Sequence, residues 1–232
     1  MMHAYFARMI DAFRPAEGPP PTTLMAFFRW CLTGAWPGLA VAGVTSALSG
    51  AAEVASATLL GAVVDLAAGT PEGRSLADHL PLIAVFVLFF VLVRPVIIGL
   101  SSASSNVIIG PNVLPLVLSR LHRWTMGHAV SFFDNDFAGR IATKQMQTAR
   151  AVTDVASEMV NTATFALSAV IGSAIYLVSV DAWGAVALVL WLLSYLVLIK
   201  FFLPRIRAKS GARASARAMI TGQVVDTITN IK

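Results

Sequence analysis

The sequence predicts an all-α membrane protein with several spans, and three observations lead to that class. Of the 232 residues, 57% are hydrophobic and only 12% are charged. The mean hydropathy is +0.75. A water-soluble domain usually carries about a quarter charged residues, so this composition excludes a soluble enzyme, a disordered chain and a secreted mini-protein. The third observation is that the apolar residues gather into four long stretches.

Each of these stretches is long enough to cross a bilayer, which takes about 20 residues of helix. The predicted spans are residues 35–66, 80–110, 156–180 and 183–203. In lipid, every backbone N–H and C=O must be bonded within its own segment unless a closed barrel forms, and the alternation typical of barrel strands is absent. We therefore expect residues 35–232 to form a polytopic helical transmembrane domain whose long helices extend into the cytoplasm.

Residues 1–34 are expected to form a separate N-terminal segment. Its proline-rich part, residues 15–21, predicts an extended spacer. After the prolines, apolar residues recur with helical spacing at Leu24, Phe27, Phe28 and Leu32. This pattern fits an amphipathic elbow helix on the membrane surface and, equally, the ordinary start of the first span.

The positive charges predict the orientation of the chain. Of the 17 lysines and arginines, all except Arg74 and Arg94 lie before the first span, between spans two and three, or at and beyond the inner end of span four. Because basic residues are retained on the cytoplasmic side near the ends of spans, both ends of the chain are predicted to be cytoplasmic, in the inner (plasma) membrane. The net charge of +5 is thus assigned to the bilayer surface, and no nucleic-acid partner is expected.

The connections on the basic side are long. Residues 111–155 have strong helical periodicity without spanning hydrophobicity. We expect span two to continue into the cytoplasm, reverse near Phe132 to Gly139, and return into span three. Residues 204–232 are rich in alanine and are expected to stay helical as the start of a second intracellular arm.

Sequence motifs for catalysis or metal binding are missing. There is no Walker A loop, no His-Glu-x-x-His pair and no nucleophile elbow. The four histidines lack metal-ligand spacing, and Cys31 is the single cysteine. The sequence therefore predicts no catalytic residue, no metal site and no nucleotide hydrolysis by this chain alone.

Two charged residues fall deep inside predicted spans, far from the span ends. Glu53 lies in span one and Arg94 in span two, and counting from the outer ends places them at nearly one depth. Because an intramembrane charge is costly, each is expected to face protein or water. Three interpretations stay open: an ion pair that locks two helices together, residues on a solute pathway, and, for Arg94 beside Pro95, a kink from which the side chain reaches the inner surface.

Small residues repeat every fourth position in span one, at Gly43, Ala47, Ala51 and Ala55. Small residues let helix backbones approach closely, and van der Waals contact stabilises helix association in lipid. This stripe predicts a tight helix contact in a bundle or an oligomer.

The reversal between spans two and three resembles the first intracellular loop of type I ABC exporters. In that family, Phe-Phe-Asp is followed five residues later by Gly, then by an aliphatic and a basic residue; here these are Gly139, Ile141 and Lys144. Thr148 stands where an acidic residue is usual, and Phe137 replaces a common proline. The segment from Gly222 to Lys232 is also similar to the helix after span four in that family. The resemblance covers most of the chain from about Leu24.

The resemblance implies six spans and a nucleotide-binding domain, with two such units per transporter. We accordingly expect this chain to be an N-terminal fragment with four of the six spans, a dimer, and a partner of a nucleotide-binding domain that binds ATP and Mg. The resemblance also implies a coupling helix that docks on that domain. Its residues would be Phe132, Phe133, Asp134, Gly139, Arg140, Ile141 and Lys144.

The leading hypothesis is the permease part of an ATP-driven exporter that works by alternating access. Glu53 and Arg94 are the candidates for its solute pathway. Apolar walls with a single acid favour hydrophobic or cationic solutes, without identifying one. The alternative is a four-span membrane scaffold or regulatory subunit that transports nothing.

Overall fold

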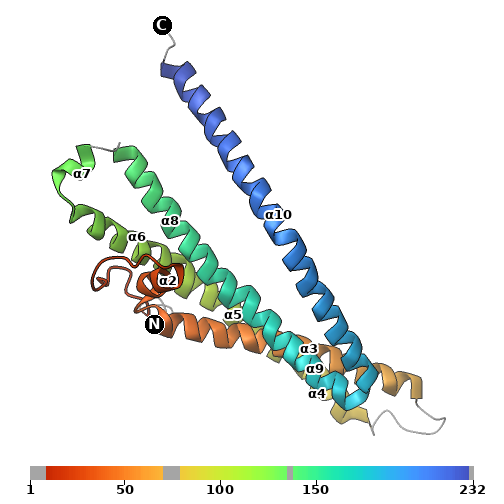
Figure 1. Cartoon of the computed structure of the whole chain (residues 1–232). Coiled ribbons are helices and arrows are strands. Elements are labelled where there is room, and N and C mark those ends of the chain that lie inside the picture. The colour runs from red at the N-terminus through yellow and green to blue at the C-terminus, as the bar shows by residue number, and fades with distance from the viewer. Residues whose placement is uncertain (1–8, 70–78, 135–137, 230–232) are drawn as a thin grey trace. The chain divides into compact units, whose positions relative to one another are not determined.

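The structure is a computed structural model that describes the backbone of residues 9–69, 79–134 and 138–229. All regular elements in these ranges are helices (Figure 1). The chain divides into two compact units, Met1–Ser173 and Ala174–Lys232, and each is described by itself. The all-helical fold class predicted from the composition is confirmed.

Within the described ranges, four helical runs are long and apolar enough to cross a membrane. They are Trp36–Ala68, Leu80–Met126, Arg140–Val180 and Ala182–Ser210. Each coincides with one of the predicted spans over nearly all of the span's length, so the predicted number and order of spans are confirmed. The second and third runs are much longer than the ~30 Å hydrocarbon core requires, as expected for helices that project beyond the bilayer.

The described part of the chain starts with a non-helical segment, called here the strap (residues 9–23), followed by helix α2 (Leu24–Leu32). A turn at residues 33–35 separates α2 from α3 (Trp36–Gly69), and Gly34 in this turn has φ +87°. A residue with a Cβ rarely adopts this left-handed conformation, so the glycine allows the break. The elbow helix is therefore a separate element. The strap is more than a spacer, because Ile10 is buried in the core of the first unit.

The second run consists of α4 (Leu80–Leu88), α5 (Arg94–Ala103) and α6 (Gly110–Met126), joined by two π-helical segments, η2 (Phe89–Val93) and η3 (Ser104–Ile109). Each π segment ends two residues before a proline, Pro95 or Pro111. Proline has no N–H and clashes with the carbonyl four residues earlier. The wider π turn accommodates both prolines without breaking the helix.

Beyond α6, the chain forms the short α7 (Val130–Asp134) and returns through α8 (Ala138–Glu158), η4 (Met159–Ala163) and α9 (Thr164–Val180). α6 and α8 pack together as a hairpin, called here the lever. Val113 and Val117 of α6 and Ala149 and Val152 of α8 are all buried in one core cluster. The expected reversal near Phe132 is confirmed, and the small Ala149 lets the two helices approach closely.

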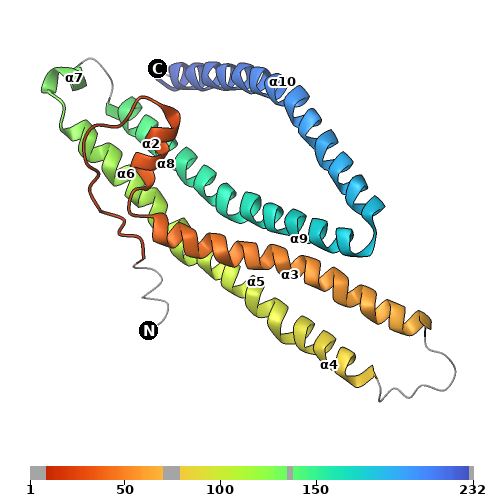
Figure 2. The ribbon, with the colours of Figure 1, turned by 60° about the horizontal axis from the view of Figure 1, so that its bottom comes forward.

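Helix α3 runs beside α5 and also contacts η4 (Figure 2). The Ser46 hydroxyl donates to the Asn161 carbonyl at 3.1 Å, and the Ser168 hydroxyl donates to the Ala47 carbonyl at 2.6 Å. A short hydrogen bond also joins Ser105 to the Asn161 side chain. Such bonds between helices stabilise bundles in lipid.

The closest approach on α3 is at Gly50, where an added Cβ would collide with the backbone carbonyl of Phe165. Gly43, in contrast, faces open space in the described part of the chain. Ala42 and Ser46 are buried, whereas Ala51 is exposed. The small-residue stripe at positions 43, 47, 51 and 55 is therefore not the tightest contact of α3 in this chain. The buried face is offset from it by one residue.

In the second unit, a turn at Asp181 connects the end of α9 to α10 (Ala182–Thr229). The Asp181 carboxylate accepts the N–H of Trp183 at 3.1 Å and so caps α10. The predicted short turn between spans three and four and the continuous helix after span four are confirmed, and the outward orientation of the turn stays a prediction. α10 bends in Figure 2, and Pro204 inside it removes one backbone hydrogen bond.

Candidate functional site

A polar cleft of about 280 Å³ lies between α3, α5 and α9 in the first unit. Its apolar walls include Ile98 and Phe165. The polar side chains that line it are Ser49, Glu53, Arg94, Ser101 and Ser102. The cleft therefore places two opposite charges and several hydroxyls inside helices long enough to span a membrane.

Glu53 and Arg94 form an ion pair at the centre of this cleft. Arg94 Nη2 donates to Glu53 Oε2 at 2.9 Å. The Arg94 guanidinium also lies over the Phe90 ring, 5.6 Å from its centroid. The sequence left open whether Arg94 pairs with Glu53 or extends along the helix toward the inner membrane surface. In the structure it pairs with Glu53. The role of the pair in a solute pathway stays a prediction.

The ion pair is incompletely satisfied and incompletely buried. The side chain of Glu53 is 56% exposed and that of Arg94 is 31% exposed. Arg94 Nε is buried and has no hydrogen-bond partner in the described part of the chain. A buried donor without a partner costs free energy, so this N–H would gain from an acceptor brought within reach by a shift of the side chain.

A second candidate region is the bend between α6 and α8. Trp124, His128, Phe132 and Phe133 stack in sequence, with successive ring centroids 4.9, 4.6 and 5.3 Å apart. His128 Nδ1 lies 3.0 Å from the Trp124 carbonyl oxygen, and because a carbonyl only accepts, Nδ1 carries the proton. This ladder holds Phe132 at the tip of the lever, where its side chain is exposed.

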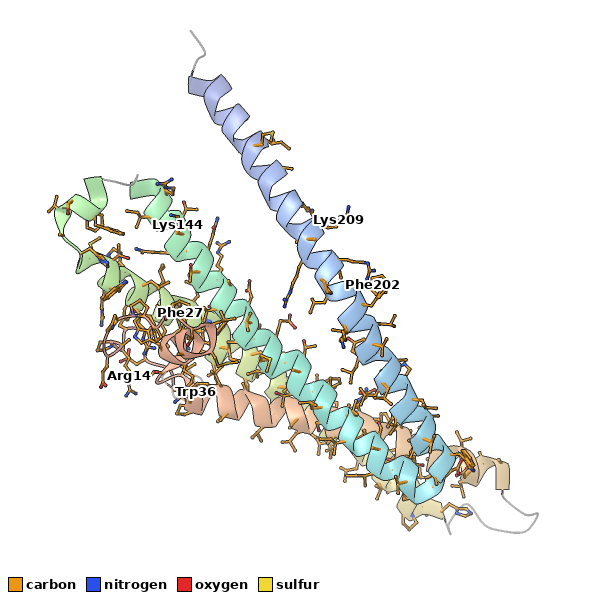
Figure 3. The ribbon with its side chains drawn as sticks, in the orientation of Figure 1. Arg14, Phe27, Trp36, Lys144, Phe202 and Lys209 are labelled. Atoms are coloured by element: carbon orange, nitrogen blue, oxygen red, sulfur yellow. The ribbon has the colours of Figure 1, made fainter. Side chains whose placement is uncertain are left out.

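The predicted coupling-helix residues are distributed around this bend. Phe132, Phe133 and Asp134 belong to α7, while Gly139, Arg140, Ile141 and Lys144 belong to α8. Arg140 and Lys144 are exposed, and Ile141 is half-buried. Figure 3 labels Lys144 near the start of α8.

Part of the predicted motif cannot be followed in the structure. Residues 135–137, including Phe137, and residues 230–232 lie outside the described residues, as does the side chain of Asp134. At the base of the bend, Gln145 Nε2 donates to Thr125 Oγ1 at 2.7 Å and joins α8 to α6. Thr148 stands where type I ABC exporters usually have an acidic residue. Its hydroxyl donates to the Lys144 carbonyl within its own helix.

Sequence reasoning missed the most deeply buried charge of the described chain, Arg120 in α6. Only 2% of Arg120 is exposed. Its Nη1 donates to the carbonyls of Trp30 at 2.7 Å and Cys31 at 2.9 Å, and its Nη2 donates to that of Thr33 at 2.5 Å. Its Nε donates to the carbonyl of Arg14 at 3.1 Å.

These contacts cap the C-terminal end of α2, where the last carbonyls of a helix lack partners within it. They also tie the strap to the lever, because Arg14 belongs to the strap. The sequence contains the signal that was missed: Val113, Leu116 and Val117 define an apolar face of α6, and Arg120 continues it at helical spacing. A charged residue on an apolar face predicts a buried polar contact.

Cys31 lies beside Arg120 and is completely buried. Burial raises the pKa of the Cys31 thiol to about 12, and the positive charge of Arg120 opposes this shift only in part. The thiol is therefore neutral at physiological pH, and Arg120 does not activate it.

The comparison with known families decides the identity of the bundle. Residues 39–232 match the ABC transporter transmembrane region. This chain belongs to that family. An uncharacterized ABC transporter ATP-binding protein from Haemophilus influenzae is similar to it, with 26% identity over 237 residues. The alignment covers all of this chain and 38% of that protein. No solved structure matches this chain.

The family membership agrees with the four spanning helices, so this is a multi-pass integral membrane protein. The resemblance found in the Phe-Phe-Asp bend is thus confirmed at the level of the family. ABC transporter membrane regions work in general with a nucleotide-binding partner and as dimers. The chain spans little more than a third of its curated relative.

Proposed function

We propose that this ABC transporter membrane region is the permease part of an ATP-driven exporter. Solute binds in the cleft around Glu53 and Arg94. The lever transmits the movement of the nucleotide-binding domain to this cleft. One observation carries the proposal: the helical run Leu80–Met126 contains both Arg94 in the cleft and Trp124 at the bend. A displacement at the bend therefore moves a wall of the cleft, as alternating access requires.

The packing of the lever supports rigid transmission. Valines and leucines of α6 interlock with Ala149 and Val152 of α8, and the Gln145–Thr125 hydrogen bond clamps the hairpin next to the bend. Close-packed interiors transmit displacement instead of absorbing it. In this proposal, Phe132, Phe133, Asp134, Gly139, Arg140, Ile141 and Lys144 dock on the nucleotide-binding domain.

The charge balance of the ion pair indicates which class of solute the cleft would bind. Because Arg94 already neutralises Glu53, the cleft has no net charge that selects cations. A zwitterionic or polar amphiphile suits it better, with one group on each charge and its apolar part against Ile98 and Phe165. This revises the sequence-based preference for hydrophobic or cationic solutes.

We assign ATP and Mg to the nucleotide-binding domain, because this sequence has no Walker A loop to cradle phosphates. The positive charges support a topology with both ends of the chain in the cytoplasm and insertion in the inner membrane. We further infer that two such membrane regions, identical or different, form the working transporter.

Transport by inside-out vesicles tests the cleft. Glu53→Gln in the intact transporter is expected to lower transport of an amphiphilic solute at unchanged assembly, because the pair can no longer orient a charged group. Asp65→Asn is the matched control, since Asp65 is an exposed acid on the same helix that does not line the cleft. Equal transport by both variants would remove Glu53 from the solute pathway.

Cysteine crosslinking tests the lever. A cysteine at Phe132 is expected to crosslink to the nucleotide-binding domain. One at the exposed Trp183, in the first turn of α10 and next to the turn predicted to be outside, is not. No crosslink at position 132, together with ATPase activity that no solute changes, would favour the membrane scaffold.

A further inference from the structure

A second pocket, of about 200 Å³, lies in the first unit between the strap, α2 and α6. Pro15, Ala16 and Gly18 of the strap form one wall. The remaining walls carry two indoles and two guanidiniums, from Trp30, Trp124, Arg120 and Arg123. We call it the elbow pocket. It is separate from the Glu53–Arg94 cleft and has no part in the proposed transport step.

The walls of the elbow pocket are fixed in place. The Trp30 indole N–H is shared between the carbonyls of Glu17 and Gly18, at 3.2 and 3.3 Å. Arg120 holds the strap at Arg14 and the C-terminal end of α2 through the four hydrogen bonds described above. The pocket is therefore formed before any ligand arrives, which lowers the entropy cost of binding.

The elbow pocket concentrates positive charge. Arg14 lies with its side chain against Gly34, and the charges of both Arg14 and Arg123 act unfavourably on Arg120. None of these three arginines forms an ion pair with a carboxylate in the described part of the chain. Asp11 is the acid that acts favourably on Arg120, and its Oδ1 already accepts the Phe13 N–H at 3.0 Å.

The hydrogen bonds of Arg120 do not supply the missing anion. All its recorded acceptors are neutral carbonyls, and the C-terminal end of α2 contributes only about half a negative charge. Cys31 stays a neutral thiol. Arginine is rarely buried without a charged partner, so an anion is expected nearby. One N–H of Nη2 is left over after these bonds, and the guanidinium of Arg123 is exposed.

Large apolar side chains are exposed on the strap, on α2 and at the start of α3, and they indicate where that anion comes from. Phe13, Leu24, Met25 and Trp36 are between 52% and 75% exposed, although each is large and apolar. Figure 3 labels Arg14, Phe27 and Trp36, which lie together where the strap, α2 and the start of α3 meet. A cationic pocket on elements that also expose large apolar side chains suits a molecule with an anionic head and hydrocarbon chains.

We propose that the elbow pocket binds a phosphate-bearing anion, namely the headgroup of an acidic phospholipid of the surrounding leaflet. Arg123 contacts the phosphate, Arg120 and Arg14 supply the field, and the acyl chains lie against Leu24 and Met25. Bound lipid then holds α2 on the bilayer surface, next to the lever.

Native mass spectrometry of the intact protein in detergent tests this site, with short-chain phosphatidylglycerol as probe and phosphatidylcholine of the same chain length as comparison. Phosphatidylglycerol is expected to bind selectively. Arg123→Gln is expected to weaken that binding about fivefold, as for one arginine near an anionic surface. Arg29→Gln is the matched control, because Arg29 is exposed on α2 and does not line the pocket.

Three outcomes would overturn the proposal. Equal binding of the two lipids would show that the pocket does not select an anion. Equal losses in Arg123→Gln and Arg29→Gln would assign the effect to diffuse surface charge. Inorganic phosphate that displaces phosphatidylglycerol at similar concentration, with the same dependence on Arg123, would make the ligand a soluble phosphate and exclude the lipid. Circular dichroism confirms that each variant is folded.

Discussion

Arg94 and Arg120 lie on the same helical run, Leu80–Met126, and their surroundings differ in every respect that matters. Arg94 is partly exposed, faces a carboxylate and has a buried Nε without a partner. Arg120 is buried and is held by four carbonyl contacts. The first arginine has interactions left to offer a ligand, whereas the second uses nearly all of its donors to hold the protein together.

The comparison shows that a charge inside an apolar segment has no single meaning. What decides its role is how completely its donors are satisfied and how far water or solute can approach. Substitutions should therefore affect stability strongly at Arg120 and weakly at Arg94. The expected effects are ordered below from the largest to the smallest.

Arg120→Met should cause the largest loss of stability. It leaves the carbonyls of Trp30, Cys31 and Thr33 without their donor in a buried place, which costs about 3 kcal/mol or more. The thermal transition of the intact protein should fall, and trypsin should cut the strap at Arg14. Arg29→Met, an exposed arginine on α2, should leave both measurements unchanged. An unaffected Arg120→Met protein would remove the contrast between the two arginines.

Gly50→Ala should come next, because its Cβ meets the Phe165 carbonyl and Phe165 lines the Arg94 cleft. Overpacking of this kind costs about 1–3 kcal/mol. Gly43→Ala is the matched control on the same helix; it faces open space and should be neutral or slightly stabilising. Equal thermal transitions for the two variants would show that α3 and α9 are not in close contact.

The Glu53–Arg94 pair should contribute little to stability. A double-mutant cycle with Glu53→Gln and Arg94→Gln, measured by SDS denaturation, should give a coupling of about 0.5–1 kcal/mol, since both side chains are partly exposed. A coupling above about 3 kcal/mol would assign the pair to helix locking and would contradict a functional role in the cleft.

The smallest effect on stability near neutral pH is expected from the ionisation of Cys31. The reactivity of this thiol reports on the packing around Arg120. With its pKa raised to about 12, the thiol should resist N-ethylmaleimide at pH 8, and the Arg120→Met variant should react faster as the elbow loosens. The raised pKa stabilises the folded state below the ordinary thiol pKa of 9.0, and this contribution is lost as the pH rises toward 12. Rapid labelling of the folded wild type would contradict the burial of Cys31.

Much of the fold follows from local patterns in the sequence. The four spans, the projecting hairpin and the short turn at Asp181 are set by runs of apolar residues and by helical periodicity, which act within one segment. The Phe-Phe-Asp bend pointed to the family because its motif also lies within one short segment. The equal depth of Glu53 and Arg94 made a pair possible, but their side-chain geometry decided that it forms.

The remaining features depend on contacts between distant segments. The sequence by itself determined which residues are helical and which cross the membrane, because the bilayer requires length and apolarity of each segment separately. Only the tertiary structure decided that Gly50 and not Gly43 lies at the tight contact, and that Arg120 caps α2 and carries the elbow pocket. Helix rotation and the partners of a buried donor are set by the neighbouring helices, which no single segment encodes.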